Sequence, residues 1–217
     1  MNKPTKRETI YTCFATEDYR ELMLAMTDSL KAVGIPSERI HAYNAKLKGD
    51  WYSRVKSKVS FMRQMCEDFP DNNVCWIDAD AVAVKPLKFF EEFDGDWGMA
   101  HEPRPGRNGD FFLSNAYIVY PSSKSMSMLL HWEYLVATIK SRTPDQTAFN
   151  HAWILHQPEI KLDFREVPLG YCWYQPHAKR EPYRSTEPII IHDIVSRKII
   201  PTHHKKKKDK MRVKTSG

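Results

Sequence analysis

Two aspartates, one residue apart, follow a short apolar segment in the first half of the chain. The apolar residues 74–77 run directly into Asp78 and Asp80 in the stretch NVCWIDADAVAVKPL. Side chains at positions i and i+2 of a strand point to the same face, so we expect both carboxylates on one side. Two like charges at that spacing repel unless a cation lies between them. The pair indicates a divalent ion that holds a phosphorylated ligand, and a solvated turn is the alternative that the spacing alone leaves open.

The segments before these aspartates alternate between strand and helix patterns. We predict strands at 9–14, 40–43 and 74–77, and helices at 19–33 and 51–68. This alternation is typical of an α/β domain with a parallel sheet and crossover helices. Ligands of such sheets bind beyond the carboxyl ends of the strands, which is where the two aspartates would lie.

The rest of the chain adds shorter elements. We predict further helices at 88–93 and 124–139 and further strands at 97–100, 112–120, 166–170, 171–174 and 188–192. Another helix is predicted to start at Thr143-Pro144-Asp145, with threonine as its cap, proline at its first position and an acid in its first turn.

The positive charge of the chain is concentrated at its C-terminal end. Seven Lys or Arg residues and one Asp within 203–217 account for the whole net charge of +6, so residues 1–202 are formally neutral. We therefore predict one domain over 1–202 and a basic tail over 203–217. Such a tail is either a solvated end or a segment that binds a polyanion such as nucleic acid by counterion release.

Membrane insertion and a disulfide framework are not expected. No apolar run approaches the roughly 20 residues of a transmembrane helix, and the first residues lack the apolar core of a signal peptide. The four cysteines are scattered and form no CxxC pair, which predicts reduced thiols and a cytoplasmic protein.

Five short motifs occur in a characteristic order. They are TEDY at 16–19, IDAD at 77–80, LSNAYIVY at 113–120, PDQTAFN at 144–150 and IIIHDIVSRK at 189–198. This order resembles the GT-A glycosyltransferases, most closely the retaining glycogenin-like group, glycosyltransferase family 8. The resemblance implies a GT-A (Rossmann-like) fold with a mixed, mostly parallel central sheet flanked by helices.

The resemblance also implies a metal site and a donor site. Asp78, Asp80 and His192 would bind Mn²⁺ or Mg²⁺, and this ion would bridge the diphosphate of the donor. Lys198 would neutralise the same phosphates, although Val195 stands where the group has a glycine.

Other motif residues would contact the rest of the donor. Thr16 and Tyr19 would line the base and ribose. Arg54 and Lys58, which fall mostly off the apolar stripe of helix 51–68, would reach the nucleotide or its phosphates.

Three polar residues match positions around the donor sugar and the reacting carbon: Asn115, Asp145 and Gln146. The first of them departs from the group, because Ser114-Asn115-Ala116 replaces its Asn-Ser-Gly. Asp145, at a helix N-terminus, would orient sugar hydroxyls or stabilise an oxocarbenium-like transition state.

The remaining histidines and the aromatic segment carry no assigned role. The histidines show no metal-ligand spacing: His41, His101, His131, His151, His156 and His177. For the aromatic residues of 171–174, core packing is favoured over stacking on a sugar or base.

The sequence therefore predicts a metal-dependent hexosyl- or pentosyltransferase that uses a nucleotide-sugar, with UDP as the expected nucleotide. Two alternatives stay open: a phosphohydrolase of the haloacid dehalogenase type, and a non-catalytic module that binds nucleic acid. The acceptor is not identified by the motifs; the basic tail suggests hydroxymethylated DNA, and a surface polysaccharide is the other hypothesis.

Overall fold

A computed structural model gives the fold and describes residues 7–47, 51–102, 111–139 and 144–192. Lys198 and the basic tail at 203–217 lie outside the described residues. Within them, no helix has the length and apolar character of a transmembrane span. The four cysteines are free and buried.

A six-stranded sheet in the order β2-β1-β3-β6-β5-β7 forms the centre of the molecule. β1 pairs in parallel with β2 and β3, β6 runs antiparallel to β3 and β5, and β7 is parallel to β5. The strands are β1 (Thr9–Ala15), β2 (Ile40–Asn44), β3 (Asn73–Ile77), β5 (Trp97–Glu102), β6 (Phe111–Val119) and β7 (Phe164–Glu166). The predicted mixed, mostly parallel sheet is confirmed.

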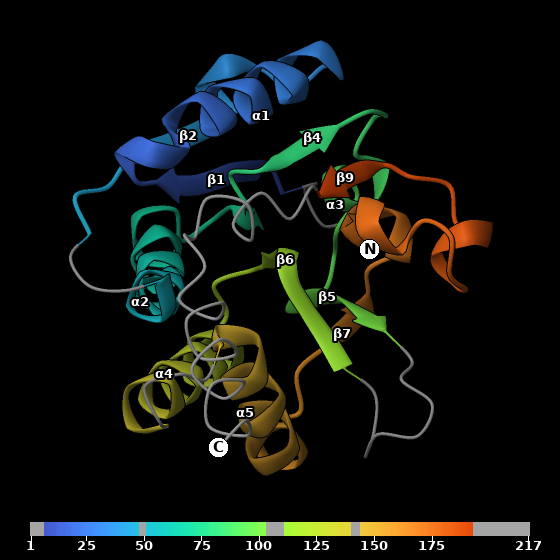
Figure 1. The fold of residues 1–217 in the computed structure, drawn as a ribbon. Coiled ribbons are helices and arrows are strands. Elements are labelled where there is room, and N and C mark those ends of the chain that lie inside the picture. Colours follow the sequence, from blue (N-terminus) through green and yellow to red (C-terminus); the bar gives the residue numbers. More distant parts are fainter. Residues whose placement is uncertain (1–6, 48–50, 103–110, 140–143, 193–217) are drawn as a thin grey trace, which may run out of the picture.

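Helices cover both faces of this sheet (Figure 1). The helix α1 packs against β1 and β2, whereas α2, α4 and α5 pack on one another and against β3 and β6. The helices are α1 (Arg20–Ala32), α2 (Trp51–Asp68), α3 (Lys88–Glu91), α4 (Ser123–Thr138) and α5 (Asp145–Ile160). The result is a three-layer α/β arrangement in which β3 and β6 are almost wholly buried.

Aromatic side chains join the sheet to α4 and α5. Trp97 of β5 stacks on Phe149 of α5 with ring centroids 5.3 Å apart, and Phe149 meets Trp132 of α4 edge-on at 4.9 Å. All three side chains are fully buried. Because α5 begins at Asp145, this cluster fixes the position of a candidate catalytic residue.

A second sheet of three short strands, in the order β4-β9-β8, lies beside the first. Its strands are β4 (Ala81–Ala83), β8 (Trp173–Tyr174) and β9 (Ile190–His192). β4 was not predicted, because three residues are too few for a period-2 pattern to show.

Three local predictions are wrong. The strand predicted at 166–170 is instead the end of β7 followed by a 3₁₀ helix at Leu169–Cys172. The same 3₁₀ helix takes the first half of the strand predicted at 171–174, so that only Trp173–Tyr174 form a strand. The Val167 N–H donates to the Met99 carbonyl (3.2 Å), but Pro168 has no N–H and cannot continue pairing with β5. Pro144 is extended and occupies the N-cap of α5, so Asp145 is the first helical residue.

Short 3₁₀ helices complete the fold. They are η1 (Glu17–Tyr19), η2 (Ser37–Arg39), η3 (Leu169–Cys172), η4 (Gln175–His177) and η5 (Tyr183–Ser185). Of these, η1 follows β1 and η4 follows β8.

The contact between α4 and α5 predicts a pH dependence of stability. Burial and the neighbouring His156 lower the pKa of His131, and the carboxylate of Glu159 only partly offsets this. A histidine whose pKa is lower in the folded state contributes stability that is present above its unfolded pKa of about 6.5 and is lost as the pH falls below it. We expect His131→Gln to lose less stability between pH 7 and pH 5 than the parent, measured by urea unfolding in the presence of EDTA. Equal losses would contradict this.

Candidate functional site

Three side chains converge beyond the carboxyl end of β3. Asp78, Asp80 and His192 each offer one ligand atom, and these atoms all lie within 4.8 Å of one another. The N–H of Asp78 donates to the Asn115 carbonyl (2.9 Å), and the N–H of Ala81 donates to the Asp78 carbonyl (3.1 Å). The two carboxylates are therefore brought together by a turn and not by the alternation of an extended strand.

The second sheet brings His192 to the two aspartates. β4 and β9 pair antiparallel, with Ala81 opposite His192. Because Ala81 directly follows Asp80, this register places the imidazole beside the end of the turn. The cluster thus depends on a contact between residues more than a hundred positions apart in the chain.

The imidazole of His192 is buried and neutral. It is 2% exposed, and its Nε2 lies 3.1 Å from the Tyr171 carbonyl. A carbonyl only accepts hydrogen bonds, so Nε2 carries the proton and Nδ1 keeps a lone pair. Burial lowers the pKa of His192 to about 4, although Asp78 acts in the opposite direction.

Nδ1 of His192 is buried and has no hydrogen-bond partner among the described residues. A buried lone pair without a partner costs free energy unless something binds it. With two carboxylates beside it, this donor set of oxygens and one neutral imidazole fits a divalent cation such as Mn²⁺ or Mg²⁺.

Lys58 of α2 lies between two of the candidate carboxylates. Its Nζ is 3.0 Å from Asp78 Oδ1 and 3.2 Å from Asp145 Oδ2, and it donates to the Ser114 carbonyl (3.0 Å). The residue is 5% exposed, so the expectation that it falls off the buried stripe of its helix is wrong. Burial alone lowers the pKa of Lys58, but Asp145 and Asp78 more than offset it and the pKa is raised.

Asp145 is the first residue of α5 and is almost fully buried. Its Oδ2 accepts a hydrogen bond from Ser114 Oγ (3.1 Å), and its carbonyl accepts one from Trp132 Nε1 (2.9 Å). The Ser114 hydroxyl and the Lys58 ammonium thus fix the orientation of the carboxylate, and the Trp132 indole fixes the backbone of Asp145. The structure joins Asp145 to the metal cluster through Lys58.

The amides predicted near the donor sugar lie beside this group. Asn115 is 2% exposed, and neither its Oδ1 nor its Nδ2 has a hydrogen-bond partner in the described part of the chain. Its backbone carbonyl contacts Asp78, so it belongs to the same edge of the sheet. Gln146 follows Asp145 in α5 and is half-buried.

A second polar group lies at the end of β1. Thr16 Oγ1 donates to Asp18 Oδ1 (2.5 Å), and Arg54 Nη1 lies 3.4 Å from Asp18 Oδ2. The hydrogen bond from Thr16, together with Arg54, lowers the pKa of Asp18. Tyr19 is half-buried one residue further on. The predicted donor residues Thr16, Tyr19 and Arg54 therefore lie close together, on a partly exposed surface.

Aromatic contacts connect the two polar groups. The rings of Phe14 in β1 and Trp76 in β3 meet at 5.3 Å, and Trp76 Nε1 donates to Asp78 Oδ1 (2.7 Å). β1 and β3 are parallel neighbours, so Thr16 and Asp78 follow the same edge of the sheet. The sequence analysis did not identify Trp76 as a site residue; its position two residues before Asp78, on the same face of a strand, is the signal that could have found it.

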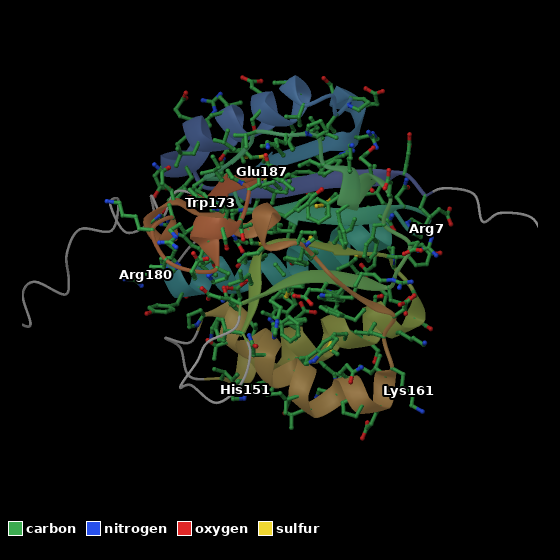
Figure 2. All side chains as sticks on the ribbon, turned by 90° about the vertical axis from the view of Figure 1, so that its right-hand side faces the viewer. Arg7, His151, Lys161, Trp173, Arg180 and Glu187 are labelled. Atoms are coloured by element: carbon green, nitrogen blue, oxygen red, sulfur yellow. The ribbon has the colours of Figure 1, made fainter. Side chains whose placement is uncertain are left out.

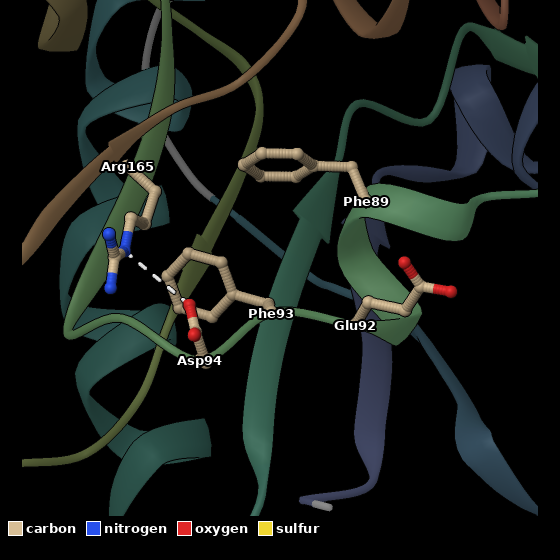
Figure 3. A pocket seen from close by; sticks show the side chains of 5 residues that line it. All are labelled: Phe89, Glu92, Phe93, Asp94 and Arg165. Atoms are coloured by element: carbon tan, nitrogen blue, oxygen red, sulfur yellow. Dashed lines mark ion pairs between the residues drawn. The ribbon is translucent and has the colours of Figure 1, made fainter.

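The described residues also form a cavity of about 230 Å³ on the opposite edge (Figure 3). Hydrogen bonds from Thr9 to the Phe90 carbonyl (2.7 Å) and from Asn73 to the Phe93 carbonyl (3.0 Å) place it at the amino ends of β1 and β3. It is lined by Phe89, Glu92, Phe93, Asp94 and Arg165. This cavity is separate from the metal cluster.

Figure 2 shows the separation of the two edges. Arg7, just before β1, lies on one side of the molecule, and Trp173 of the second sheet lies on the other. The side of Trp173 is the one that carries His192, because β8 and β9 pair with Trp173 opposite Ile191.

No protein-family model matches the chain, and no curated protein is similar to it in sequence. Solved structures are similar in fold. A glycosyltransferase involved in the glycosylation of the major capsid of PBCV-1 superposes with a TM-score of 0.60 at 14% identity, over 86% of this chain and 93% of that one.

Two further glycosyltransferases have similar folds. The galactosyltransferase LgtC, in complex with donor and acceptor sugar analogs, gives a TM-score of 0.57 at 12% identity, over 86% of this chain and 87% of its own. GlyE from Streptococcus pneumoniae TIGR4 gives 0.56 at 14% identity, and the chain spans about half of it (54%). These likenesses confirm the predicted GT-A fold, whereas membership of the glycogenin-like group stays a prediction.

Replacing Lys58 tests the buried ion pairs. In Lys58→Met, Asp78 and Asp145 would face each other without a cation, and we expect a loss of roughly 3 kcal/mol in the free energy of unfolding. Lys56→Met on the same helix is the matched control, because Lys56 donates to the Ile139 carbonyl (3.3 Å) and forms no ion pair with Asp78 or Asp145 in the described part of the chain. Urea unfolding measures both; equal losses would show that Lys58 does not hold the two carboxylates.

Proposed function

We propose that the protein is a metal-dependent glycosyltransferase that moves a sugar from a nucleotide-sugar, with UDP as the nucleotide. The observation that carries this proposal is the cluster of Asp78, Asp80 and His192 at the carboxyl edge of the sheet, joined through Lys58 to Asp145. A hydrolase or a plain binding module needs no such link between a metal site and a second buried carboxylate.

The metal would be Mn²⁺ or Mg²⁺, and the imidazole nitrogen favours Mn²⁺ because Mg²⁺ prefers oxygen ligands. When bound, the ion stabilises the negative charge of the departing diphosphate. Asp78, Asp80 and His192 hold it. Trp76 and Lys58 fix the orientation of Asp78 through its Oδ1, at 2.7 Å and 3.0 Å.

Asp145 would act on the donor sugar. Its carboxylate is held by Lys58 and by the Ser114 hydroxyl, so it meets the sugar in a preset orientation. There it orients sugar hydroxyls or stabilises positive charge that develops at the anomeric carbon. The amides of Asn115 and Gln146 offer further hydrogen bonds to the sugar.

The group at the end of β1 would bind the nucleoside. Thr16 and Tyr19 contact the base and ribose, and Arg54 exchanges its partly exposed contact with Asp18 for the nucleotide. Lys198 adds a positive charge at the phosphates. Retention of the anomeric configuration rests on the resemblance to the glycogenin-like group, and a cytoplasmic location rests on the four buried free thiols.

The phosphohydrolase alternative is less well supported. The metal cluster in the described residues contains a histidine, whereas a haloacid dehalogenase would need a downstream acidic pair to complete its site. In addition, the aspartates follow β3 and not the first strand of the sheet.

For the acceptor, we propose a hydroxymethylated base in DNA, approached with the help of the cationic segment 203–217. A surface polysaccharide is the alternative acceptor. Attraction to DNA phosphates is strong at low salt and falls steeply as salt is added. We expect deletion of 203–217 to weaken binding of a DNA duplex at low salt, measured by fluorescence anisotropy. Unchanged binding would remove the support for a DNA acceptor.

The metal assignment is tested by Asp80→Ala. We expect Mn²⁺-dependent release of UDP from UDP-glucose or UDP-galactose to fall by at least about 100-fold. Mutating even a group that only orients a metal ligand lowers metal affinity or activity about 10–100-fold. Asp71→Ala, an exposed aspartate in the turn before β3, is the matched control. Circular dichroism checks that both variants fold.

Three outcomes separate the functions. Release of UDP by the parent and its loss in Asp80→Ala support the transferase. Release of phosphate from p-nitrophenyl phosphate supports the hydrolase. Neither activity, with DNA binding retained, supports the nucleic-acid module.

A further inference from the structure

Two histidines from neighbouring helices meet on the side of the molecule formed by α4 and α5. The ring centroids of His131 in α4 and His156 in α5 are 3.6 Å apart, with the ring planes tilted by 47°. Both residues are half-buried, so their rings are reachable from solvent. The sequence analysis assigned them no role, because they are far apart in the chain and only the pairing of the helices unites them.

The helices are antiparallel, and this brings the pair near the C-terminal end of α5. Lys124 at the start of α4 donates to the Lys161 carbonyl just beyond α5 (3.0 Å), which sets the direction of the pairing. The C-terminal end of a helix carries partial negative charge and favours a cation. The carboxylate of Glu159, one turn beyond His156, acts electrostatically on His131.

Neutral imidazole is a preferred ligand of Zn²⁺, Ni²⁺, Co²⁺ and Cu²⁺. Protonating both imidazoles would place two positive charges side by side, so the contact favours the neutral form of each ring. The neutral form is the one that binds a metal ion.

We propose that His131 and His156 form a second metal site, which binds a transition-metal ion of the zinc and nickel class. Two histidines are its protein ligands, and water completes the coordination. Among the described residues, only Asp78, Asp80 and His192 bring three ligand atoms together, so the two sites differ in kind. The first is rich in oxygen ligands, and the second offers two nitrogens.

An ion at this site would fasten α4 to α5. Trp132, the residue after His131, donates its Nε1 to the carbonyl of Asp145 at the start of α5 (2.9 Å). A ligand that binds only the folded state also stabilises it by mass action. The site would therefore stiffen the helix pair that positions Asp145, at a distance from the reaction itself.

Isothermal titration of NiCl₂ into the full chain tests the proposal. We compare the parent with His131→Ala, His156→Ala and His151→Ala. His151 is exposed on the same helix, at the outer surface in Figure 2, and is the matched control. All four proteins share the Asp78 cluster and the tail histidines, so the differences between them report the pair alone.

We expect both His131→Ala and His156→Ala to lose one equivalent of Ni²⁺ or to bind it about tenfold or more weakly, and His151→Ala to match the parent. The rise in melting temperature with Ni²⁺ should disappear in the same two variants. Equal binding by all four proteins, or a loss in only one of the two pair variants, would overturn the site.

Circular dichroism checks that the alanine variants fold. If one does not, the glutamine variant at the same position, His131→Gln or His156→Gln, replaces it, since glutamine keeps much of the size and polarity of histidine. The measurement reads metal binding and not sugar transfer. Its result therefore stands whether or not UDP release is found.

Discussion

Lys58 is a buried cation between two carboxylates, and the arrangement of the site depends on it. Asp78 belongs to the metal cluster and Asp145 starts α5, so the two come from different layers of the molecule. Removing an ammonium and two carboxylates from water is costly, and only their mutual contacts and hydrogen bonds offset that cost. The Trp76 indole, the Ser114 hydroxyl and the Ser114 carbonyl supply those bonds. The sheet, α2 and α5 are thereby fixed relative to one another at the point where the donor would bind.

The second constraint is the small sheet that carries His192. Its strands have only two or three residues, yet the pairing of β4 with β9 is what sets the imidazole beside the aspartates. The Tyr171 carbonyl then fixes the protonated nitrogen of His192, and burial keeps the ring neutral. The tautomer and orientation of the His192 imidazole are therefore set by hydrogen bonding alone, as is usual for the groups that surround a metal site.

Local patterns in the sequence were sufficient to predict the large helices and strands and to place the two aspartates after β3. The apolar run at 74–77 predicted β3, because strand and helix periods are local properties. The GT-A fold was predicted by the resemblance of the motif order to that family. The burial of Lys58 could not be predicted from local patterns. A charged side chain is expected to be exposed, and Lys58 is stable in a buried position only because two carboxylates from other elements contact it. The pairing of β4 with β9 and the contact between His131 and His156 likewise require the tertiary structure.

The two proposed metal sites differ in their ligands. Asp78 and Asp80 offer carboxylate oxygens at the edge of the sheet, which would suit a hard divalent ion, and the Lys58 ammonium lies beside Asp78. Imidazoles on helices suit a softer ion, and no phosphate is needed to complete that site. Trp132 connects the pair of helices α4 and α5 to the carbonyl of Asp145. A change at His131 and His156 would therefore affect Asp145 through the packing of these helices, because the two sites share no ligand.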